Sequence, residues 1–313
     1  MSTVLVTGGA GFIGSNVVRE LLARGDAVRV LDDLSTGARD NLAGLPVELR
    51  IGDVRDAEAV RTLARGADAV VHLAAMISVP ASFDNPAGCY EANALGSLHV
   101  LEAARRENVR RVVLSSSCAV YGDHDGAVSE DSVTRPMSPY ASSKLAMEEA
   151  ARLYGVAFGL ETVCLRPFNV YGPRQDEGSP YAAVIPLFIR AMVDGRPAVI
   201  YGDGKQTRDF VYVADVVQAI RLALSSPSAA GGVFNIAHGR SVSIVELGRT
   251  LTRLIPGASE PRFAEARPGD IRTSAADIRR AGKALGYRPA WDLHKGLAAT
   301  VEWMRAASRP TGE

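Results

Sequence analysis

The chain has 313 residues, of which 47% are hydrophobic and 22% are charged, a composition typical of a globular protein with a sizeable core. Its 35 basic residues balance its 35 acidic residues, which argues against a basic surface for nucleic acid. No apolar run reaches the roughly 18 residues of a membrane span, and no signal-peptide pattern is present. Three widely spaced cysteines and five scattered histidines indicate no disulfide framework and no metal site, so we expect a cytoplasmic protein.

Apolar, β-branched segments alternate with amphipathic segments in the first half of the chain. The pattern predicts strands at 3–7, 27–31, 47–51, 69–73, 111–115 and 162–166, and helices at 13–24, 88–106 and 140–154. Strands that alternate with helices form a parallel sheet with helices on both faces. We therefore predict an α/β fold with a doubly wound parallel sheet.

The pattern changes after Gly172, where a Pro- and Gly-rich stretch indicates a loop or linker. Beyond it we predict short strands at 199–201 and 233–236, and helices at 184–193, 243–254, 277–285 and 293–304. A further helix follows the stretch RDFVYVADV and ends at about Leu224. This indicates a first domain over 1–175 and a smaller α+β domain over 176–313, with a segment near 207–240 returning to the first.

Three glycines, Gly8, Gly11 and Gly14, lie between the first strand and the first helix. Small residues there let backbone amides approach a pyrophosphate at the positive end of a helix, as in a Rossmann-type domain. The acidic pair Asp32 and Asp33 ends the second strand, about twenty residues further on, where a carboxylate binds ribose hydroxyls. Because a carboxylate repels a 2′-phosphate, the pattern favours NAD over NADP.

Two further segments fit the same cofactor. Asp53, after the third strand, either contacts the adenine or caps the helix that follows. Leu73, Ala74 and Ala75 end the fourth strand, where small residues let the chain pass close to a bound dinucleotide.

Tyr140 and Lys144 are spaced to lie on one face of a helix that Ser138-Pro139 opens. An ammonium beside a phenol lowers the pKa of the phenol, which makes Tyr140 a candidate general base. A serine from the triplet 115–117 can share the same substrate oxygen. Such a group can remove a proton from an alcohol while a hydride leaves the same carbon.

The motifs TGGAGFIG, LDDLSTG, GDVRD, HLAA, SSSCAVYG, SPYASSK, RPFNVYGPR and RDFVYVADV follow one another in this order. In this order they resemble the extended short-chain dehydrogenase/reductase superfamily and, within it, the UDP-sugar 4-epimerases. The resemblance runs from about Thr3 to Trp303. It implies a tightly held NAD, a proton taken by Tyr140 from the sugar 4-hydroxyl, a transient 4-keto sugar, and return of the hydride to the opposite face.

The resemblance also assigns residues to the site. Ser117 is implied as the hydroxyl on the sugar 4-oxygen, and Lys144 as the group that binds the nicotinamide ribose. The implied cofactor site comprises Gly8, Gly11, Phe12, Ile13, Gly14, Asp32, Asp33, Asp53, Val54, Leu73, Ala74, Ala75, Asn93, Ser115, Tyr140 and Lys144. The implied substrate site comprises Ser116, Ser117, Asn169, Val184, Val199, Tyr201, Arg208, Arg267, Asp270 and Ser274.

Several of these residues have a second interpretation. Ser115 and Ser116 could cap the strand end, Arg208 and Arg267 could be surface arginines, and the apolar strand at 199–201 could serve core packing.

Two departures from related enzymes bear on the reaction and on the sugar. Dehydratases and decarboxylases of the superfamily place a carboxylate directly after the active-site hydroxyl, but here Cys118 and Ala119 follow, which argues against those reactions. Ser274 occupies a gate position that is a tyrosine in enzymes limited to glucose and galactose. The small side chain favours an additional N-acetylhexosamine substrate unless neighbouring side chains refill the space.

A UDP-glucuronate substrate is an alternative, with Arg174, Ser116 and Asn169 as candidate groups near C6. Net oxidation or reduction of a nucleotide sugar, and a non-catalytic role on the same fold, are further alternatives. The resemblance also implies a homodimer in which the helices predicted at 88–106 and 140–154 pair into a four-helix bundle.

Overall fold

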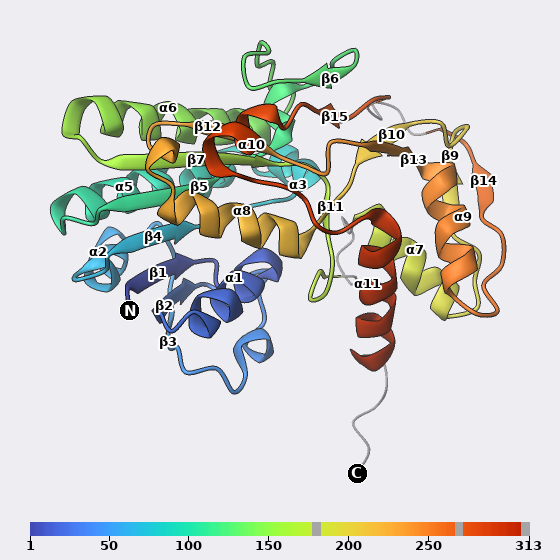
Figure 1. Cartoon of the computed structure of the whole chain (residues 1–313), viewed down its shortest axis with the longest axis horizontal. Coiled ribbons are helices and arrows are strands. Elements are labelled where there is room, and N and C mark those ends of the chain that lie inside the picture. Colours follow the sequence, from blue (N-terminus) through green and yellow to red (C-terminus); the bar gives the residue numbers. More distant parts are fainter. Residues whose placement is uncertain (177–182, 267–271, 308–313) are drawn as a thin grey trace.

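The computed structural model describes residues 1–176, 183–266 and 272–307. Its centre is a parallel sheet of seven strands in the order β12-β7-β5-β4-β1-β2-β3 (Figure 1). The strands are β1 (Thr3–Thr7), β2 (Ala27–Asp32), β3 (Glu48–Ile51), β4 (Ala69–His72), β5 (Arg111–Ser115), β7 (Glu161–Pro167) and β12 (Val233–Ile236). The predicted doubly wound α/β fold is confirmed.

Helices cover both faces of this sheet because strand side chains alternate between the faces. Val4 and Val6 belong to the apolar cluster that includes α1 and α8, whereas Leu5 belongs to the cluster of α2, α5 and α6. The bounds are α1 (Phe12–Ala23), α2 (Ala57–Ala64), α5 (Gly96–Arg106), α6 (Pro139–Phe158) and α8 (Val213–Ser225). The carboxyl ends of all seven strands therefore lie at one edge, where such folds bind ligands.

A smaller unit lies beyond that edge and carries short strand pairs and three helices (Figure 1). The helices are α7 (Val184–Val193), α9 (Ile244–Leu254) and α11 (Leu293–Ala307), and α10 (Arg279–Leu285) packs near β12. The pairs are β9 (Val199–Tyr201) with β14 (Arg262–Ala264), β10 (Thr207–Asp209) with β13 (Ser241–Ser243), β8 (Val170–Tyr171) with β11 (Val211–Tyr212), and β6 (Ala127–Val128) with β15 (Ala275–Ala276). The chain passes between the two units several times, since β12 and α8 pack with the large sheet.

The helix predicted at 88–106 is interrupted. It comprises α4 (Pro86–Tyr90), a π-helical turn η2 (Glu91–Leu95) and α5, and α3 (Val79–Asp84) precedes it. Asn85 caps α4 by accepting from the amide of Gly88 at 3.0 Å. The remaining short helical turns are η1 (Arg39–Leu42), η3 (Cys118–Tyr121) and η4 (Pro227–Ala229).

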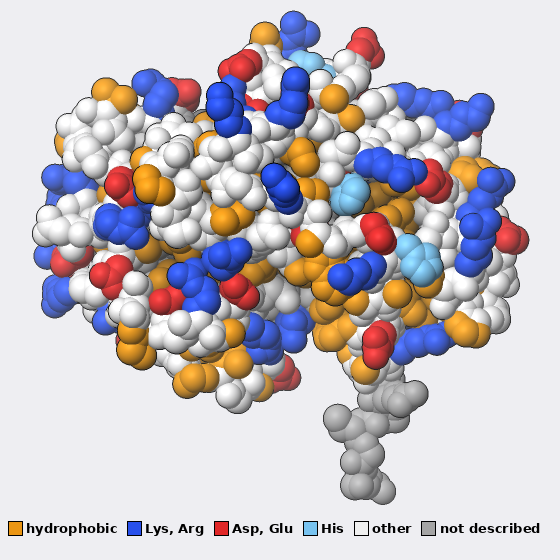
Figure 2. All heavy atoms as spheres, in the orientation of Figure 1, with side chains coloured by type: hydrophobic (Ala, Val, Ile, Leu, Met, Phe, Trp, Pro, Cys, Tyr) orange, Lys and Arg blue, Asp and Glu red, His pale blue; other side chains and the backbone are white. Residues whose placement is uncertain are grey.

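Basic and acidic side chains are interspersed on the face of the molecule that Figure 2 shows. Within the described ranges no helix is long and apolar enough to cross a membrane. The same residues contain no group of three or more potential metal ligands.

Candidate active site

Two positions in the segment that follows β1, Gly8 and Gly14, have no room for a side chain. Gly8 has φ +71°, and a Cβ there would lie 2.7 Å from the backbone nitrogen of Ala74. A Cβ on Gly14 would overlap the carbonyl oxygen of Gly8. The helix α1 then begins after Gly11, which makes no side-chain cap, so its first amides point into the turn. This arrangement suits a pyrophosphate.

Asp32 ties this loop to the end of β2. Its carboxylate accepts hydrogen bonds from the amides of Ala10 at 2.8 Å and Leu34 at 2.9 Å. Burial raises the pKa of Asp32, and the two backbone hydrogen bonds oppose that effect. Asp33 instead binds the amide and hydroxyl of Ser35 at 2.9 and 2.7 Å. Of the acidic pair, the structure therefore brings Asp32 to the glycine loop.

Asp53 does not cap the following helix, so that interpretation is wrong. Asp56 caps α2 by accepting from the amides of Glu58 and Ala59. The Asp53 carboxylate instead forms an ion pair with Arg55 at 2.6 Å, and this guanidinium lowers the pKa of Asp53. Its contact with adenine stays a prediction.

Asn93 connects the end of β4 to α6. Its amide accepts from the backbone nitrogen of Met76 at 2.7 Å and donates to the hydroxyl of Ser143 at 3.0 Å. The nearby Val54, also expected at the cofactor, is buried against Gly96. Asn93 therefore positions the chain after Leu73–Ala75, close to the glycine loop.

The three expected catalytic residues come together at the carboxyl end of β5. Ser138 caps α6 by accepting from the amide of Ala141 at 3.1 Å, which sets the start of the helix. The hydroxyl of Ser117 lies close enough to the phenol of Tyr140 to lower the pKa of that phenol. The ammonium of Lys144 donates to the carbonyl of Ser115 at 2.8 Å.

The expected lowering of the Tyr140 pKa by Lys144 is not what the protein's own groups produce. Burial raises the pKa of Tyr140 to about 12, and only the Ser117 hydrogen bond opposes it appreciably. The Lys144 nitrogen lies 6.0 Å from the centre of the Tyr140 ring and is engaged by Ser115. Burial also lowers the pKa of Lys144 to about 8.

Ser116 was expected at the substrate, but its side chain is directed elsewhere. It is 2% exposed, and its hydroxyl donates to the carboxylate of Glu148. Alternate side chains of an extended chain point to opposite sides, so the neighbour of Ser117 faces away from Tyr140. The prediction that the Ser116 side chain contacts the substrate is therefore wrong.

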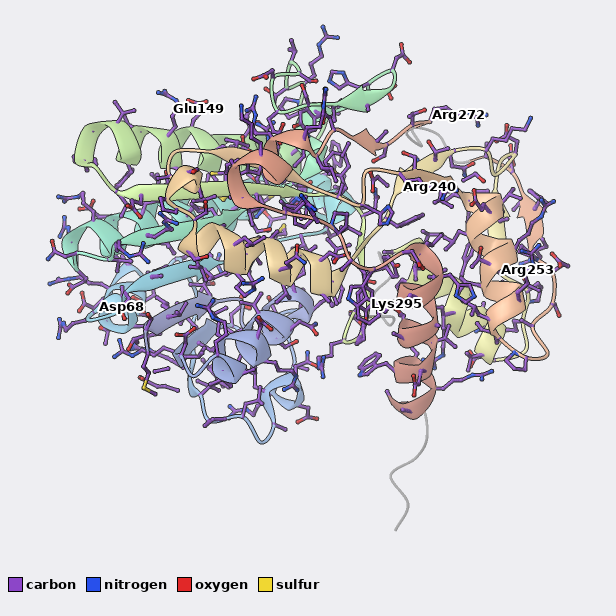
Figure 3. The ribbon with its side chains drawn as sticks, viewed as in Figure 1. Asp68, Glu149, Arg240, Arg253, Arg272 and Lys295 are labelled. Carbon is purple, nitrogen blue, oxygen red and sulfur yellow. The ribbon has the colours of Figure 1, made fainter. Side chains whose placement is uncertain are left out.

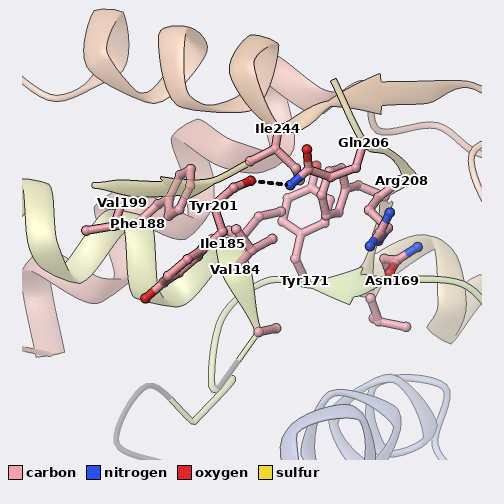
Figure 4. A pocket seen from close by; sticks show the side chains of 13 residues that line it. Asn169, Tyr171, Val184, Ile185, Phe188, Val199, Tyr201, Gln206, Arg208 and Ile244 are labelled. Carbon is pink, nitrogen blue, oxygen red and sulfur yellow. Dashed lines mark hydrogen bonds between the residues drawn. The ribbon is translucent and has the colours of Figure 1, made fainter. Parts of the chain in front are cut away.

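A cavity of about 410 Å³ lies in the smaller unit, between α7, β8, β9, β10 and the start of α9 (Figure 4). Five expected substrate residues line it: Asn169, Val184, Val199, Tyr201 and Arg208. Sequence reasoning missed the apolar and aromatic remainder of the wall, which includes Tyr171, Ile185, Phe188, Phe210 and Ile244. One end is polar, because Arg208 and Asn169 lie side by side there, and the other end is apolar.

Cys118 connects the polar end of this cavity to the catalytic residues. The backbone of Asn169, the side chain of Ser117 and the guanidinium of Arg208 all influence the pKa of its thiol, and Cys118 in turn influences the pKa of Tyr140. Burial raises the pKa of Cys118 to about 11, so it is a thiol at neutral pH.

Ser274 lies beside Asn169, whose amide donates to its hydroxyl at 3.3 Å. The position of the serine is fixed by its backbone nitrogen, which donates to the carbonyl of Thr207 at 3.0 Å. The expected substrate residues Arg267 and Asp270 lie outside the described residues.

Comparison with known proteins places these features in a family. Residues 4–237 match the model of the NAD dependent epimerase/dehydratase family. The chain is 41% identical to a UDP-glucose 4-epimerase of Mycolicibacterium smegmatis over 97% of this chain and 99% of that protein. It is 39% identical to a dTDP-glucose 4,6-dehydratase of Streptomyces griseus, over 96% and 93% of the two chains.

A solved structure is similar throughout. The UDP-N-acetylglucosamine 4-epimerase of Methanobrevibacter ruminantium, in complex with UDP-N-acetylmuramic acid, superimposes with a TM-score of 0.94 and 38% identity. The match covers 98% of this chain and 99% of that one. The chain described here belongs to the NAD dependent epimerase/dehydratase family.

Proposed function

We propose that this protein is an NAD-dependent UDP-sugar 4-epimerase. One observation carries the proposal: the Tyr140–Ser117 pair and Lys144 meet at the carboxyl edge of the sheet, next to a cavity whose polar end holds Arg208 and Asn169. The glycine loop and Asp32 lie at the same edge.

In this reaction Tyr140 takes the proton of the sugar 4-hydroxyl, and Ser117 holds the same oxygen. Bound NAD would supply the acceptor and donor of the C4 hydride, so that the hydride can return to the opposite face of the 4-keto sugar. Lys144 would bind its nicotinamide ribose, and the positive charge of the nicotinamide would offset the effect of burial, which raises the Tyr140 pKa to about 12. Tyr140 returns the proton at the end of the cycle.

The cavity fits the UDP portion of the substrate. Arg208 would donate paired hydrogen bonds to two oxygens of the diphosphate, and the Asn169 amide lies beside it. The apolar wall with Val199 and Tyr201 receives the uracil ring. A volume of about 410 Å³ is in the range of small-molecule sites.

The sugar is UDP-glucose/galactose or a UDP-N-acetylhexosamine. The small Ser274 beside Asn169 supports the larger substrate. Two side chains that were candidates for binding the carboxylate of UDP-glucuronate have other partners. Arg174 donates to Asn16 of α1 at 3.1 Å, and Ser116 donates to Glu148. These contacts argue against UDP-glucuronate as the substrate.

Dehydration is the second candidate reaction, because the chain resembles a dTDP-glucose 4,6-dehydratase nearly as closely as it does an epimerase. The residues after Ser117 favour epimerisation. Cys118 carries a thiol with a raised pKa and Ala119 carries no acid, so neither supplies the carboxylate that acts at C5 or C6. A dehydratase would yield a 4-keto-6-deoxy sugar from dTDP-glucose.

A homodimer is part of the proposal. Apolar side chains are exposed on α4 to α5 and on α6: Tyr90, Leu95, Leu98, Leu153, Val156 and Phe158. Contiguous exposed apolar surface marks an interaction site. We expect two copies to pair these helices into a four-helix bundle, with a mass in light scattering of about twice 33.1 kDa. Leu98→Glu/Leu153→Glu should give monomers, and Val133→Glu, at an exposed residue outside these helices, should not.

The test of the reaction is incubation of the purified protein, without added NAD, with UDP-glucose, UDP-N-acetylglucosamine, UDP-glucuronate and dTDP-glucose separately. Proton NMR should show a 4-epimer from at least one UDP-sugar, with no net NADH released. Net NADH would indicate an oxidoreductase, and a 4-keto-6-deoxy product would indicate a dehydratase. No product from any substrate, before and after NAD is added, would contradict the proposal.

A further inference from the structure

The catalytic helix α6 holds each residue of the serine triplet 115–117 through a different side chain. Tyr140 meets the hydroxyl of the third serine, and Lys144 donates to the carbonyl of the first at 2.8 Å. Glu148 accepts from the hydroxyl of the second. These three residues are spaced by four and share one face of the helix. The third contact has no part in the reaction described above.

Glu148 is itself fixed by a paired interaction with Arg166 of β7. The guanidinium donates to the two carboxylate oxygens at 2.8 and 2.6 Å, and both residues are about 5% exposed. A third nitrogen of Arg166 donates to the Tyr121 hydroxyl at 2.9 Å. The pKa of Arg166 is raised by Glu148 even though burial alone would lower it. The two hydrogen bonds therefore hold the carboxylate in a fixed orientation.

A buried ion pair of this kind is a poor source of stability, because removing two charges from water costs about as much as their attraction returns. Apolar residues could fill the same space. The pair is better explained by the geometry that it imposes on the strand end beside it, where Ser117 reaches Tyr140.

We propose that Glu148, held by Arg166, is a positioning residue that fixes the serine triplet against α6 and supports the charge of Lys144. The catalytic consequence rests on the proposed function, whereas the electrostatic part concerns only the chain's own residues.

Glu148 is one of several groups that influence the charge of Lys144. Besides Tyr140 and the Ser115 carbonyl, Lys144 faces His72 at the end of β4 and the thiols of Cys89 on α4 and Cys164 on β7. His72 is neutral, since burial lowers its pKa to about 3. Burial lowers the pKa of Lys144, and Cys89, Cys164 and, to a smaller extent, Glu148 oppose that effect. Glu148 is the carboxylate in this set, four residues along the same face of α6.

Because the chain has few lysines, the effect of Glu148 on the pKa of Lys144 can be measured by NMR without substrate. The chain has four lysines: Lys144, Lys205, Lys283 and Lys295. Protein labelled with ¹³C at the lysine ε-carbon should give four signals, and Lys144→Met identifies the one of interest. In Glu148→Gln the titration midpoint of Lys144 should fall by at least about half a pH unit, because an opposite charge nearby is lost.

Glu149→Gln is the matched control. Glu149 is the next residue of α6 and is exposed (Figure 3). It pairs at the surface with Arg152 at 3.0 Å. It should leave the Lys144 midpoint unchanged. Equal midpoints in Glu148→Gln and the wild type, or equal shifts in the two variants, would overturn the electrostatic part.

A separate variant, Ser116→Ala, tests whether Glu148 positions the serine triplet. Ser116→Ala keeps both buried charges but removes the contact between Glu148 and the triplet. It should leave the Lys144 midpoint in place and lower kcat at least about tenfold with little change in KM. Unchanged kcat would overturn the positioning role. A protein without epimerase activity would contradict the proposed function, and the NMR titration would still decide the electrostatic part.

Discussion

The ammonium of Lys144 lies 6.0 Å from the centre of the Tyr140 ring and donates its hydrogen bond to the backbone carbonyl of Ser115 at 2.8 Å. Helical spacing places both side chains on one face of α6, but the partner of the ammonium is the end of β5. The lysine therefore joins the catalytic helix to the sheet and carries a buried charge at that junction.

Tyr140→Phe should keep the fold and the bound NAD but reduce turnover by about 10²–10⁴-fold, the usual contribution of a general acid–base group. NAD content is measured by chromatography of the denatured protein, and turnover by NMR. Tyr154→Phe, on the same helix and hydrogen-bonded to Glu102, is the control and should stay near wild type. Near-normal turnover of Tyr140→Phe would rule out the proposed base.

Lys144→Met should abolish activity yet stabilise the protein, since the ammonium is buried at a cost. The pKa of Lys144 falls from 10.5 to about 8 on folding. That shift corresponds to about 3 kcal/mol in the free energy of unfolding at neutral pH. Between pH 8 and pH 10.5 the unfolded chain holds a proton on Lys144 that the folded chain lacks, so the stability of the wild type rises with pH. The difference in unfolding free energy between Lys144→Met and the wild type should therefore shrink as pH rises. Urea unfolding of both proteins measures it, and a less stable Lys144→Met would contradict the prediction.

His72 should make stability fall on acidification. Its ring nitrogens lie 2.7 Å from the Thr7 hydroxyl and 2.9 Å from the Ser97 hydroxyl, and burial lowers its pKa from 6.5 to about 3. Below pH 6.5 the unfolded chain takes up a proton that the folded chain excludes, so stability is lost as pH falls.

From pH 7 to about pH 5 this loss amounts to about 2 kcal/mol. Urea unfolding at the two pH values should show it in the wild type and in His294→Gln, an exposed control, but not in His72→Gln. The same pH dependence in His72→Gln would assign the effect to other groups.

Ser274→Tyr should select against large sugars. A phenol ring beside Asn169 would fill space that an acetamido group needs, so kcat/KM for UDP-N-acetylglucosamine should fall at least about tenfold relative to UDP-glucose. Ser274→Ala, which keeps the space, should preserve the ratio. Equal losses on both sugars in Ser274→Tyr would refute the gate.

The order of strands and helices could be predicted because their signals are local. The strand predicted at 199–201 and the helix predicted at 184–193 coincide with β9 and α7. The π-turn η2 could not be predicted, because Asn93 is held there by Met76 and Ser143, which are distant in sequence. Two-residue strands such as β6 and β15 likewise exist only through their pairing.

The catalytic group could be predicted from spacing and family motifs, but its electrostatics could not. The approach of Lys144 to Tyr140 suggested a lowered pKa, and burial reverses that result. The role of Glu148 was missed because its partner Arg166 comes from a different element, and a charged residue within a helix normally indicates an exposed face. Ser116 was misplaced because a triplet gives no sign of which hydroxyl faces the site.

In the proposed reaction the hydride leaves C4 and returns to the same carbon without exchange with water. This can be tested with the UDP-sugar that the protein turns over, labelled with deuterium at C4, in ordinary water without added NAD. We expect a 4-epimer that retains the deuterium at C4, seen by NMR and mass spectrometry. A 4-epimer that has lost the deuterium to solvent would contradict it.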